Sequence, residues 1–280
     1  MTESRKEDLL GKVAIGFLAS ASGFFSTTTM LYRYMMSEIW NERAKIHPIE
    51  ETVSVVMASL NEESTIENAL LSLRRQNVLR EYGDLFEFIL VDSYSTDRTV
   101  ELAEPYVDRI IFCEPGKLTA KDKGIREAKG EIIVNVDADS FYPPNFLNLL
   151  LRHFREPIVV AVGSPRLVAE PNLIGVGYVW KAIIDFILNN RLPGSSSAFR
   201  RQAYFEVGGY NLSINQFDRA EIVQEEEVNI TNKLKTVGKV KFDLKAPCLT
   251  SPRFWYCFAP EIPSEETYRY CATVISGERF

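Results

Sequence analysis

Two carboxylates stand one residue apart where an apolar segment ends, in the sequence Glu131-Ile-Ile-Val-Asn-Val-Asp-Ala-Asp139. Alternate side chains share one face of an extended backbone, so Asp137 and Asp139 should point the same way. Like charges that lie so close repel unless a cation sits between them. Hard oxygen ligands favour Mg²⁺ or Mn²⁺, which usually bind substrate phosphates as well. The pattern predicts either a metal site for a phosphorylated ligand or a solvated acidic turn without function.

Composition and charge narrow the range of partners. The chain has 280 residues, of which 46% are apolar, and this suffices for one large α/β domain or two small ones. A net charge of −6 argues against a nucleic-acid partner, which needs a basic face. An anionic substrate would therefore be held by a metal ion and a few local cations. The four cysteines show no C-x-x-C spacing, so neither a zinc site nor a disulfide framework is indicated.

Apolar and helical segments alternate along the chain. The segments with strand character are 53–58, 86–91, 109–112, 131–139 and 157–162. The segments with helical spacing between and after them are 63–75, 95–103, 117–129 and 173–190. This alternation predicts an α/β fold with right-handed crossovers and a mainly parallel sheet. Ligands of such sheets lie beyond the carboxyl ends of the strands, where Asn61, Asp92 and Asp139 are expected to meet.

Two later segments carry polar side chains that are candidates for a site. Residues 192–198 are predicted to form a flexible polar loop, in which Ser195 and Ser196 can hold an acceptor. Gln224-Glu225-Glu226-Glu227 is predicted to open a helix that stops at Gly238. Acids in the first turn of a helix interact favourably with its positive end, and this alone would account for the glutamates.

The order of these motifs resembles a family 2 glycosyltransferase, with the GT-A fold of inverting sugar transferases. The resemblance runs from Val53 to Asp243. It rests on Ser59-Leu-Asn61-Glu62 for "x-Y-N-E", Val91-Asp92-Ser-Tyr-Ser-Thr-Asp97 for "V-D-D-G-S-T-D", Lys117-Leu-Thr-Ala-Lys-Asp-Lys-Gly124 for "R/K-x-x-A-x-N-x-G", Asp137-Ala138-Asp139 for "D-x-D", Val207-Gly-Gly-Tyr210 for "V-G-G-[FY]" and Glu226-Glu227 for "E-D". It implies a GT-A, Rossmann-like nucleotide-diphospho-sugar transferase sandwich around a mainly parallel sheet.

The resemblance also implies an activity: metal-dependent, inverting transfer of a single sugar from a UDP- or GDP-linked donor to a hydroxyl acceptor on a glycan, a lipid or a protein. Asp139 and Asp137 would hold Mn²⁺ or Mg²⁺ on the diphosphate. Glu227 would take the acceptor's proton, unless the helix register brings Glu226 or Glu225 forward instead. The residues implied to contact the nucleotide sugar are Ser59, Asn61, Glu62, Asp92, Lys117, Asp137, Ala138 and Asp139.

Some positions depart from the pattern of this family. Leu60 replaces an aromatic residue and Ser93 replaces an acid, so the nucleobase stays open between uracil and guanine. Residues 251–255 lack the "Q-x-x-R-W" element of processive synthases, which favours transfer of a single sugar. Two alternatives remain: an inactive GT-A-like binding or scaffold protein, and a nucleotidyltransferase, although the glycine-rich phosphate loop of the latter is missing.

Three regions are predicted from the distribution of these features. They are an N-terminal helical segment with a linker (1–51), the GT-A domain (52–250) and a C-terminal extension (251–280). Residues 13–32 carry no charge and are long enough to span a bilayer, although serines and threonines dilute their apolarity. This stretch is expected to anchor the chain in a membrane, to lie on a membrane surface or to pack on the domain. The catalytic domain is expected on the cytoplasmic side.

Overall fold

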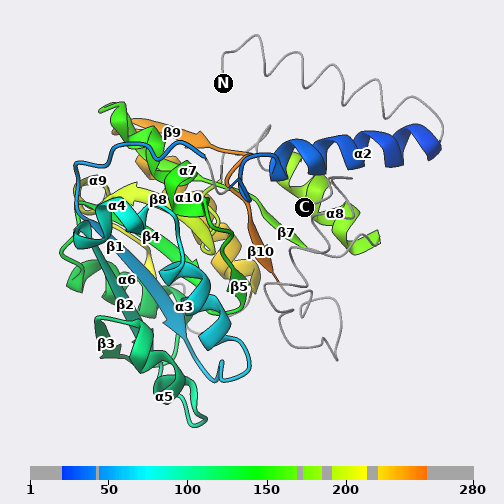
Figure 1. Cartoon of the computed structure of the whole chain (residues 1–280). Coiled ribbons are helices and arrows are strands. Elements are labelled where there is room, and N and C mark those ends of the chain that lie inside the picture. Colours follow the sequence, from blue (N-terminus) through cyan, green and yellow to red (C-terminus); the bar gives the residue numbers. More distant parts are fainter. Residues whose placement is uncertain (1–20, 42–43, 169–172, 185–190, 213–219, 251–280) are drawn as a thin grey trace.

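A computed structural model describes residues 21–41, 44–168, 173–184, 191–212 and 220–250 of the chain. A seven-stranded sheet runs through its centre (Figure 1). In spatial order its strands are β3 (Arg109–Phe112), β2 (Phe86–Asp92), β1 (Val53–Ser59), β4 (Ile132–Asp137), β8 (Ser196–Arg200), β6 (Val159–Gly163) and β9 (Lys239–Phe242). All neighbours are parallel except for β8, which is antiparallel to β4 and β6. The predicted α/β fold with a mainly parallel sheet is confirmed.

Helices and a second sheet complete the fold. The helices are α2 (Ala21–Met36), α3 (Ile66–Arg74), α4 (Leu79–Tyr82), α5 (Thr99–Ala103), α6 (Lys117–Glu127), α7 (Phe146–Leu151), α8 (Leu173–Ile184), α9 (Arg201–Glu206) and α10 (Ala220–Leu234). Three short 3₁₀ turns follow α4, α5 and α7, at Gly83–Leu85, Glu104–Tyr106 and Arg152–Arg155. The smaller sheet contains β5 (Ser140–Phe141), β10 (Cys248–Thr250) and β7 (Arg166–Val168), in that order.

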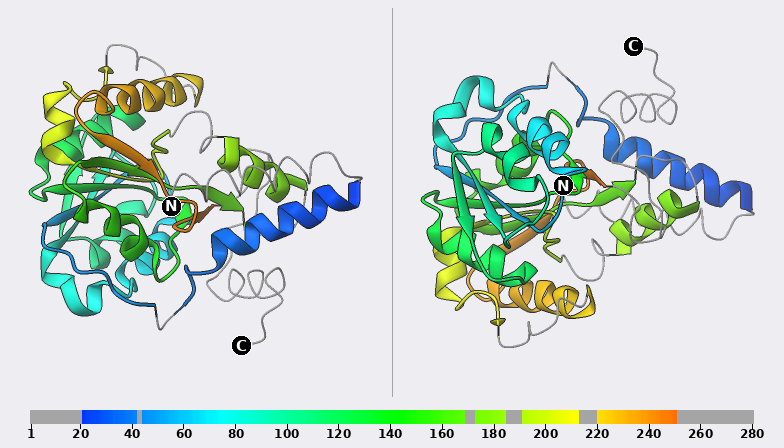
Figure 2. Two further views of the ribbon diagram at one scale, coloured as in Figure 1. Left: turned by 90° about the horizontal axis from the view of Figure 1, so that it is seen from above. Right: turned by 90° about the horizontal axis from the view of Figure 1, so that it is seen from below.

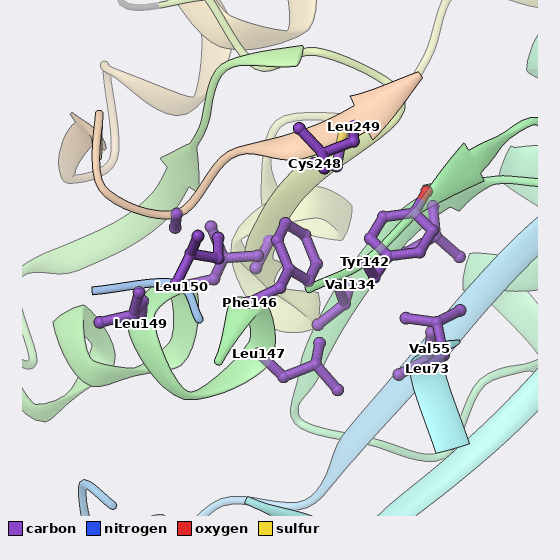
Figure 3. Close-up of a cluster of buried hydrophobic side chains, with 14 of the residues drawn as sticks. Val55, Leu73, Val134, Tyr142, Phe146, Leu147, Leu149, Leu150, Cys248 and Leu249 are labelled. Carbon is purple, nitrogen blue, oxygen red and sulfur yellow. The ribbon is translucent and has the colours of Figure 1, made fainter. Parts of the chain in front are cut away.

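The central strands are buried on both faces, and successive side chains enter two different cores. Val55 and Val134 belong to a core that also contains residues of α3 and α7, whereas Val56 and Ile133 join a core with residues of α6, α9 and α10. Figure 3 shows part of the first core, including Val134 of β4 and Phe146 of α7. A strand that is covered on both sides has no polar face, which explains the continuous apolar runs in the sequence.

Strand register brings the predicted polar residues to one edge of the sheet. Ser59 lies opposite Asp92, and Ala58 lies opposite Asp137. On the far side of β2, Asp92 lies opposite Phe112, the last residue of β3. The carboxyl ends of four neighbouring strands are therefore aligned, as the alternating pattern predicted.

The N-terminal helix α2 is part of the folded domain. Leu31 and Met35 are fully buried and belong to the same core as β1. Trp180 of α8 donates its indole N–H to Thr28 at 3.1 Å, and α2 and α8 lie side by side as they leave the sheet (Figure 2). Within the described ranges no helix combines the length and the apolarity that a bilayer crossing needs. Of the uncharged stretch, residues 13–20 lie outside these ranges, as does the predicted extension 251–280.

Two sequence-based expectations were wrong. Residues 192–198 are buried rather than a flexible loop, and from Ser196 onward they form β8 in the middle of the sheet. The helix with three consecutive glutamates begins at Ala220 rather than at Gln224. The glutamates therefore lie beyond the first turn, where the effect of the helix dipole has faded, and it no longer accounts for them.

Helix α6 packs directly on β1 and β2 at Gly124, which has no side chain. A Cβ atom at this position would lie 2.4 Å from Cγ1 of Val56 and 2.8 Å from Cγ2 of Val91. We predict that Gly124→Ala lowers the free energy of unfolding by about 1–2 kcal/mol, because overpacking outweighs the better helix propensity of alanine. Urea denaturation would measure this change.

Gly83→Ala is the matched control for this variant. A Cβ atom there meets nothing within 4 Å, and its φ of −54° suits alanine. We expect its unfolding free energy to stay the same or to rise slightly. Equal losses of stability in the two variants would contradict the close packing of α6.

Candidate active site

Asp137, at the end of β4, is the centre of the polar cluster at the carboxyl edge. Its buried carboxylate accepts hydrogen bonds from Nζ of Lys117 at 2.9 Å and Nζ of Lys121 at 3.0 Å. Burial by itself raises the pKa of Asp137, but the two ammonium charges outweigh it and hold the pKa far below its usual range. Asp137 is therefore an anion that two cations stabilise inside the protein.

Both lysines come from the start of α6, and their spacing of four residues places them on one helix face. They differ in exposure. The side chain of Lys117 is 40% exposed, whereas that of Lys121 is 2% exposed. Burial lowers the pKa of Lys121, and the charge of Asp137 opposes this only in part. Lys117 is therefore the lysine that an anionic ligand can reach.

Asp139 stands beyond the end of β4 and is partly exposed. Among the described residues its carboxylate accepts one hydrogen bond, from the Ser140 hydroxyl at 3.4 Å. The described chain contains no cluster of three or more His, Cys, Asp or Glu residues that could hold a metal ion. A magnesium-type ion needs only one or two protein carboxylates when a diphosphate supplies further oxygens, so Asp139 fits such an ion. The oxygens of Asp137 already face lysines, and its predicted role as a metal ligand stays a prediction.

Glu227 of α10 is connected to this cluster through the backbone of Gly194. Its Oε1 accepts a hydrogen bond from the Gly194 N–H at 2.7 Å, and the Gly194 carbonyl accepts one from Nζ of Lys121 at 2.6 Å. Arg191 forms an ion pair with Oε2 of Glu227 at 3.7 Å. A Cβ atom on Gly194 would lie 2.4 Å from Nζ of Lys121 and 2.8 Å from Oε1 of Glu227. The close approach of these groups therefore depends on a glycine at position 194.

The other two glutamates of α10 occupy different surroundings. Glu226 is buried, and it accepts hydrogen bonds from the backbone N–H of Asn211 at 2.7 Å and from Nδ2 of Asn229 at 2.9 Å. Glu225 is exposed to solvent. Of the three glutamates, Glu227 is thus the one that is joined to the cluster around Asp137.

The segment after β1 is tied to the segment after β2. Asp92 is fully buried; its Oδ1 accepts hydrogen bonds from the hydroxyls of Ser59 and Ser95, and its Oδ2 accepts one from the Ser95 N–H. The backbone N–H of Glu62 donates to the Thr99 hydroxyl at 2.7 Å. Asn61, with a φ of +54°, accepts a hydrogen bond from the Thr96 N–H. Asp92 thus fixes the turn, and its contact with a nucleobase stays a prediction.

Of the two serines predicted to hold an acceptor, Ser196 begins β8 and Ser195 lies in the turn just before it. The hydroxyl of Ser196 donates to the Ser164 carbonyl at 2.7 Å, and the carbonyl of Ser195 accepts a hydrogen bond from Tyr142. Both serines are at most 2% exposed. The two serines therefore do not belong to a flexible loop, and their predicted contact with an acceptor stays a prediction.

Sequence reasoning did not single out Lys121, Gly194 or Arg166. Arg166 of β7 is a further cation whose charge lowers the pKa of Asp137, although burial and the two lysines have larger effects. Lys121 follows Lys117 by one helical turn, so its spacing alone could have identified it. Gly194 and Arg166 carry no such signal, because only the folded sheet brings them to Asp137.

Comparison with known proteins gives one family. Residues 54–204 match the family described as "Glycosyl transferase family 2". Over 118 residues the chain is 33% identical to the "Dolichol-phosphate mannosyltransferase" of Pyrococcus furiosus, which covers 40% of this chain and 32% of that protein. Over 241 residues it is 24% identical to the "Poly-beta-1,6-N-acetyl-D-glucosamine synthase" of Staphylococcus aureus, covering 78% and 55%. The chain spans between about a third and about half of the length of these relatives.

Two solved structures share the fold. The mannosyltransferase PcManGT from Pyrobaculum calidifontis, in complex with GDP-Man and Mn²⁺, has a TM-score of 0.57 and 21% identity, covering 92% of this chain and 70% of that one. TarS 1–349 of S. aureus, in complex with UDP-GlcNAc, has a TM-score of 0.53 and 17% identity, covering 80% and 65%. At such identities the likeness shows the fold alone. The expected GT-A sheet is thereby confirmed.

The lysine pair predicts different roles in stability for two neighbouring acids. We expect Asp137→Asn to lower the unfolding free energy at neutral pH by about 3 kcal/mol, because two lysines lose their buried counter-ion. Asp139→Asn is the matched control and should leave stability nearly unchanged, since Asp139 is partly exposed. Thermal and urea denaturation of the two variants would measure this difference.

This loss of stability should depend on pH. The folded-state pKa of Asp137 lies below the unfolded value near 3.8, so its contribution is complete above about pH 4 and fades as the pH falls further. The gap between wild type and Asp137→Asn should therefore shrink in acid. A gap that stayed constant down to pH 3 would show that Asp137 is not held as an anion.

Proposed function

The chain belongs to glycosyl transferase family 2, and on that premise we propose that it transfers a single sugar from a UDP- or GDP-linked donor to a hydroxyl acceptor, with inversion at the anomeric carbon. The series of contacts from Asp137 through Lys121 and Gly194 to Glu227 carries this proposal. It joins Asp137, which also holds the exposed ammonium group of Lys117, to a carboxylate suited to accept a proton. Inverting transfer from a nucleotide sugar needs a positive charge near the diphosphate and a base near the acceptor hydroxyl.

The donor's diphosphate would lie at the exposed end of this cluster. Mn²⁺ or Mg²⁺ held by Asp139, with Asp137 behind it, would neutralise charge on the departing nucleoside diphosphate. The ammonium group of Lys117 adds a positive charge at the same edge, where it is 40% exposed. Lys121 is enclosed, and it holds Asp137 and the Gly194 carbonyl in place.

Glu227 is proposed as the general base. It accepts the proton of the acceptor hydroxyl while the acceptor oxygen bonds to the anomeric carbon, on the face opposite the breaking bond to the phosphate oxygen. The hydrogen bond from Gly194 and the nearby Arg191 keep the carboxylate in one orientation. Glu226 holds the chain at Asn211 and is assigned a supporting role.

Two of the similar solved structures support a nucleotide-sugar donor, but they do not decide between uracil and guanine as its nucleobase. The mannosyltransferase is in complex with GDP-Man and Mn²⁺, and TarS with UDP-GlcNAc. The acceptor is proposed by class only, as a hydroxyl of a glycan, a lipid or a protein.

Incubating the purified chain with Mn²⁺ and a panel of UDP- and GDP-sugars tests the activity, and free UDP or GDP is the product to score. Nucleotide binding without turnover toward any acceptor in the panel would favour the inactive binding protein. Release of pyrophosphate from a nucleoside triphosphate and a sugar phosphate would instead indicate a nucleotidyltransferase. Asp139→Asn should lose the metal dependence of nucleotide binding while its thermal stability stays unchanged.

We predict that Glu227→Gln reduces sugar transfer by roughly 100-fold or more, because an amide cannot accept the proton. Nucleotide binding in the presence of Mn²⁺ should persist. Glu226→Gln is the matched neighbour: it should lower thermal stability but keep a far larger share of kcat per folded molecule. Single-turnover kinetics would separate the two variants. If Glu226→Gln were inactive and Glu227→Gln active, the general base would be Glu226.

We also propose that residues 13–32 bring the chain to a membrane, with the catalytic domain on the cytoplasmic side. The support is the uncharged stretch itself; because its residues 21–32 belong to α2, with Leu31 in the domain core, residues 13–20 would make the membrane contact. A truncation to test this must begin near Ala21, because removal of α2 would expose the core around Leu31 and Met35. The full chain should sediment with vesicles and the truncated chain should not. Equal amounts of the two chains in the soluble fraction would refute the anchor.

A further inference from the structure

Two exposed aromatic rings are stacked at the carboxyl edge of the sheet. Tyr94 follows β2 and is 56% exposed, and Phe112 ends β3 and is 45% exposed. Their ring centres lie 5.8 Å apart, with an angle of 14° between the ring planes. Leu60, just after β1, is 43% exposed. Exposed apolar side chains that gather at the ends of neighbouring strands indicate a binding surface rather than scattered surface residues.

The backbone presents Tyr94 in a conformation that a tyrosine adopts at a cost. Its φ is +56°, in the left-handed region where glycine is favoured. Aligned with the "V-D-D-G-S-T-D" turn, Tyr94 stands where that motif has glycine. Strained residues persist where the surrounding structure fixes them, and they cluster at functional sites. A ring that adds strain and remains in solvent contributes little to the core, so a ligand is the better explanation for it.

The turn that carries this ring is held on both sides. The Asp92 carboxylate accepts hydrogen bonds from the N–H and the hydroxyl of Ser95, and the Asp92 carbonyl accepts one from the Cys113 N–H at 3.0 Å. The last of these bonds ties the turn to the chain just after Phe112. The backbone that carries the two rings is therefore held in place before a ligand arrives.

We propose that the outer face of Tyr94, supported from behind by Phe112, stacks on the nucleobase of the donor. This inference rests on the proposed function and deepens it. Stacking suits a planar base, whichever base it is, because every nucleobase has a π-face. Tyr94 would also supply the aromatic ring that the family pattern has at position 60, where this chain has Leu60.

The spacing of the strands agrees with a nucleotide that runs across the sheet edge. In the order β2-β1-β4, the ends of β2 and β4 are two strand spacings apart, which is about 10 Å. A nucleoside diphosphate that places its phosphates at Lys117 and Asp139 extends over a comparable length. Its base then arrives at the turn after β2, where Tyr94 stands.

Calorimetric titration of the full chain with UDP and with GDP, in the presence of Mn²⁺, tests this inference. Tyr94→Gly should raise the Kd of the nucleotide that wild type binds by about 10- to 100-fold, since it removes one stacked ring. Tyr94→Phe keeps the π-face and should stay within about threefold of wild type. Tyr94→Gly also relieves the positive φ, so its thermal stability should equal or exceed that of wild type.

Two controls distinguish the contact with the nucleobase from contacts elsewhere in the site. Inorganic pyrophosphate with Mn²⁺ probes the phosphate end alone, and its affinity should be the same in wild type and Tyr94→Gly. Ile158→Ala removes an exposed apolar side chain that precedes β6 at the opposite edge of the sheet, and it should bind nucleotide as wild type does.

The outcomes distinguish this inference from the proposed function. Wild type that binds neither nucleotide overturns both. Wild type that binds, together with a Tyr94→Gly variant that binds equally well, overturns the stacking role alone. A Tyr94→Gly variant that also loses pyrophosphate overturns it too, because the site as a whole would then be disturbed. Altered self-association at unchanged nucleotide affinity would identify the surface as a contact between copies, again against the proposal.

Discussion

The buried anion Asp137, held between two lysines of one helix, is the constraint on which the rest of the carboxyl edge depends. An isolated carboxylate at that depth would be too costly to keep ionised, so the start of α6 must lie close to the end of β4. That closeness requires a glycine at position 124, because any side chain there would push α6 away from β1 and β2. The close packing at Gly124 thus helps to place the two lysines of α6 beside Asp137.

Lys121 transmits this constraint to the second half of the chain. By donating to Asp137 and to the Gly194 carbonyl, it connects the four-stranded parallel half of the sheet to the segment that leads into β8. The N–H of the same glycine meets Glu227. Lys121 and Glu227 are therefore held next to each other by the carbonyl and the N–H of one residue, Gly194.

Most of the fold could be predicted from the sequence, and the misses have a common physical origin. Strands such as Ile132–Asp137 are mostly apolar, so their burial can be predicted from composition alone. The burial of β8 cannot be predicted in this way, because Ser196 and Ser197 are buried polar residues. Ser196 exchanges hydrogen bonds with Ser164 in the neighbouring segment, which satisfies its polar groups. Local composition cannot reveal a partner 32 positions away. For the same reason the contact between Lys121 and Gly194, 73 positions apart, was missed. The acid pair and the Glu226-Glu227 pair are local patterns, so they could be named as candidates from the sequence.

The helix α2 has a consequence for how the molecule is oriented. Because Leu31 and Met35 are buried in the same core as β1, the helix and the sheet move as one body. Whatever is joined ahead of residue 21 is therefore attached to a rigid helix of the domain rather than to a flexible linker. The carboxyl edge of the sheet therefore keeps a fixed orientation relative to the point where that segment is attached.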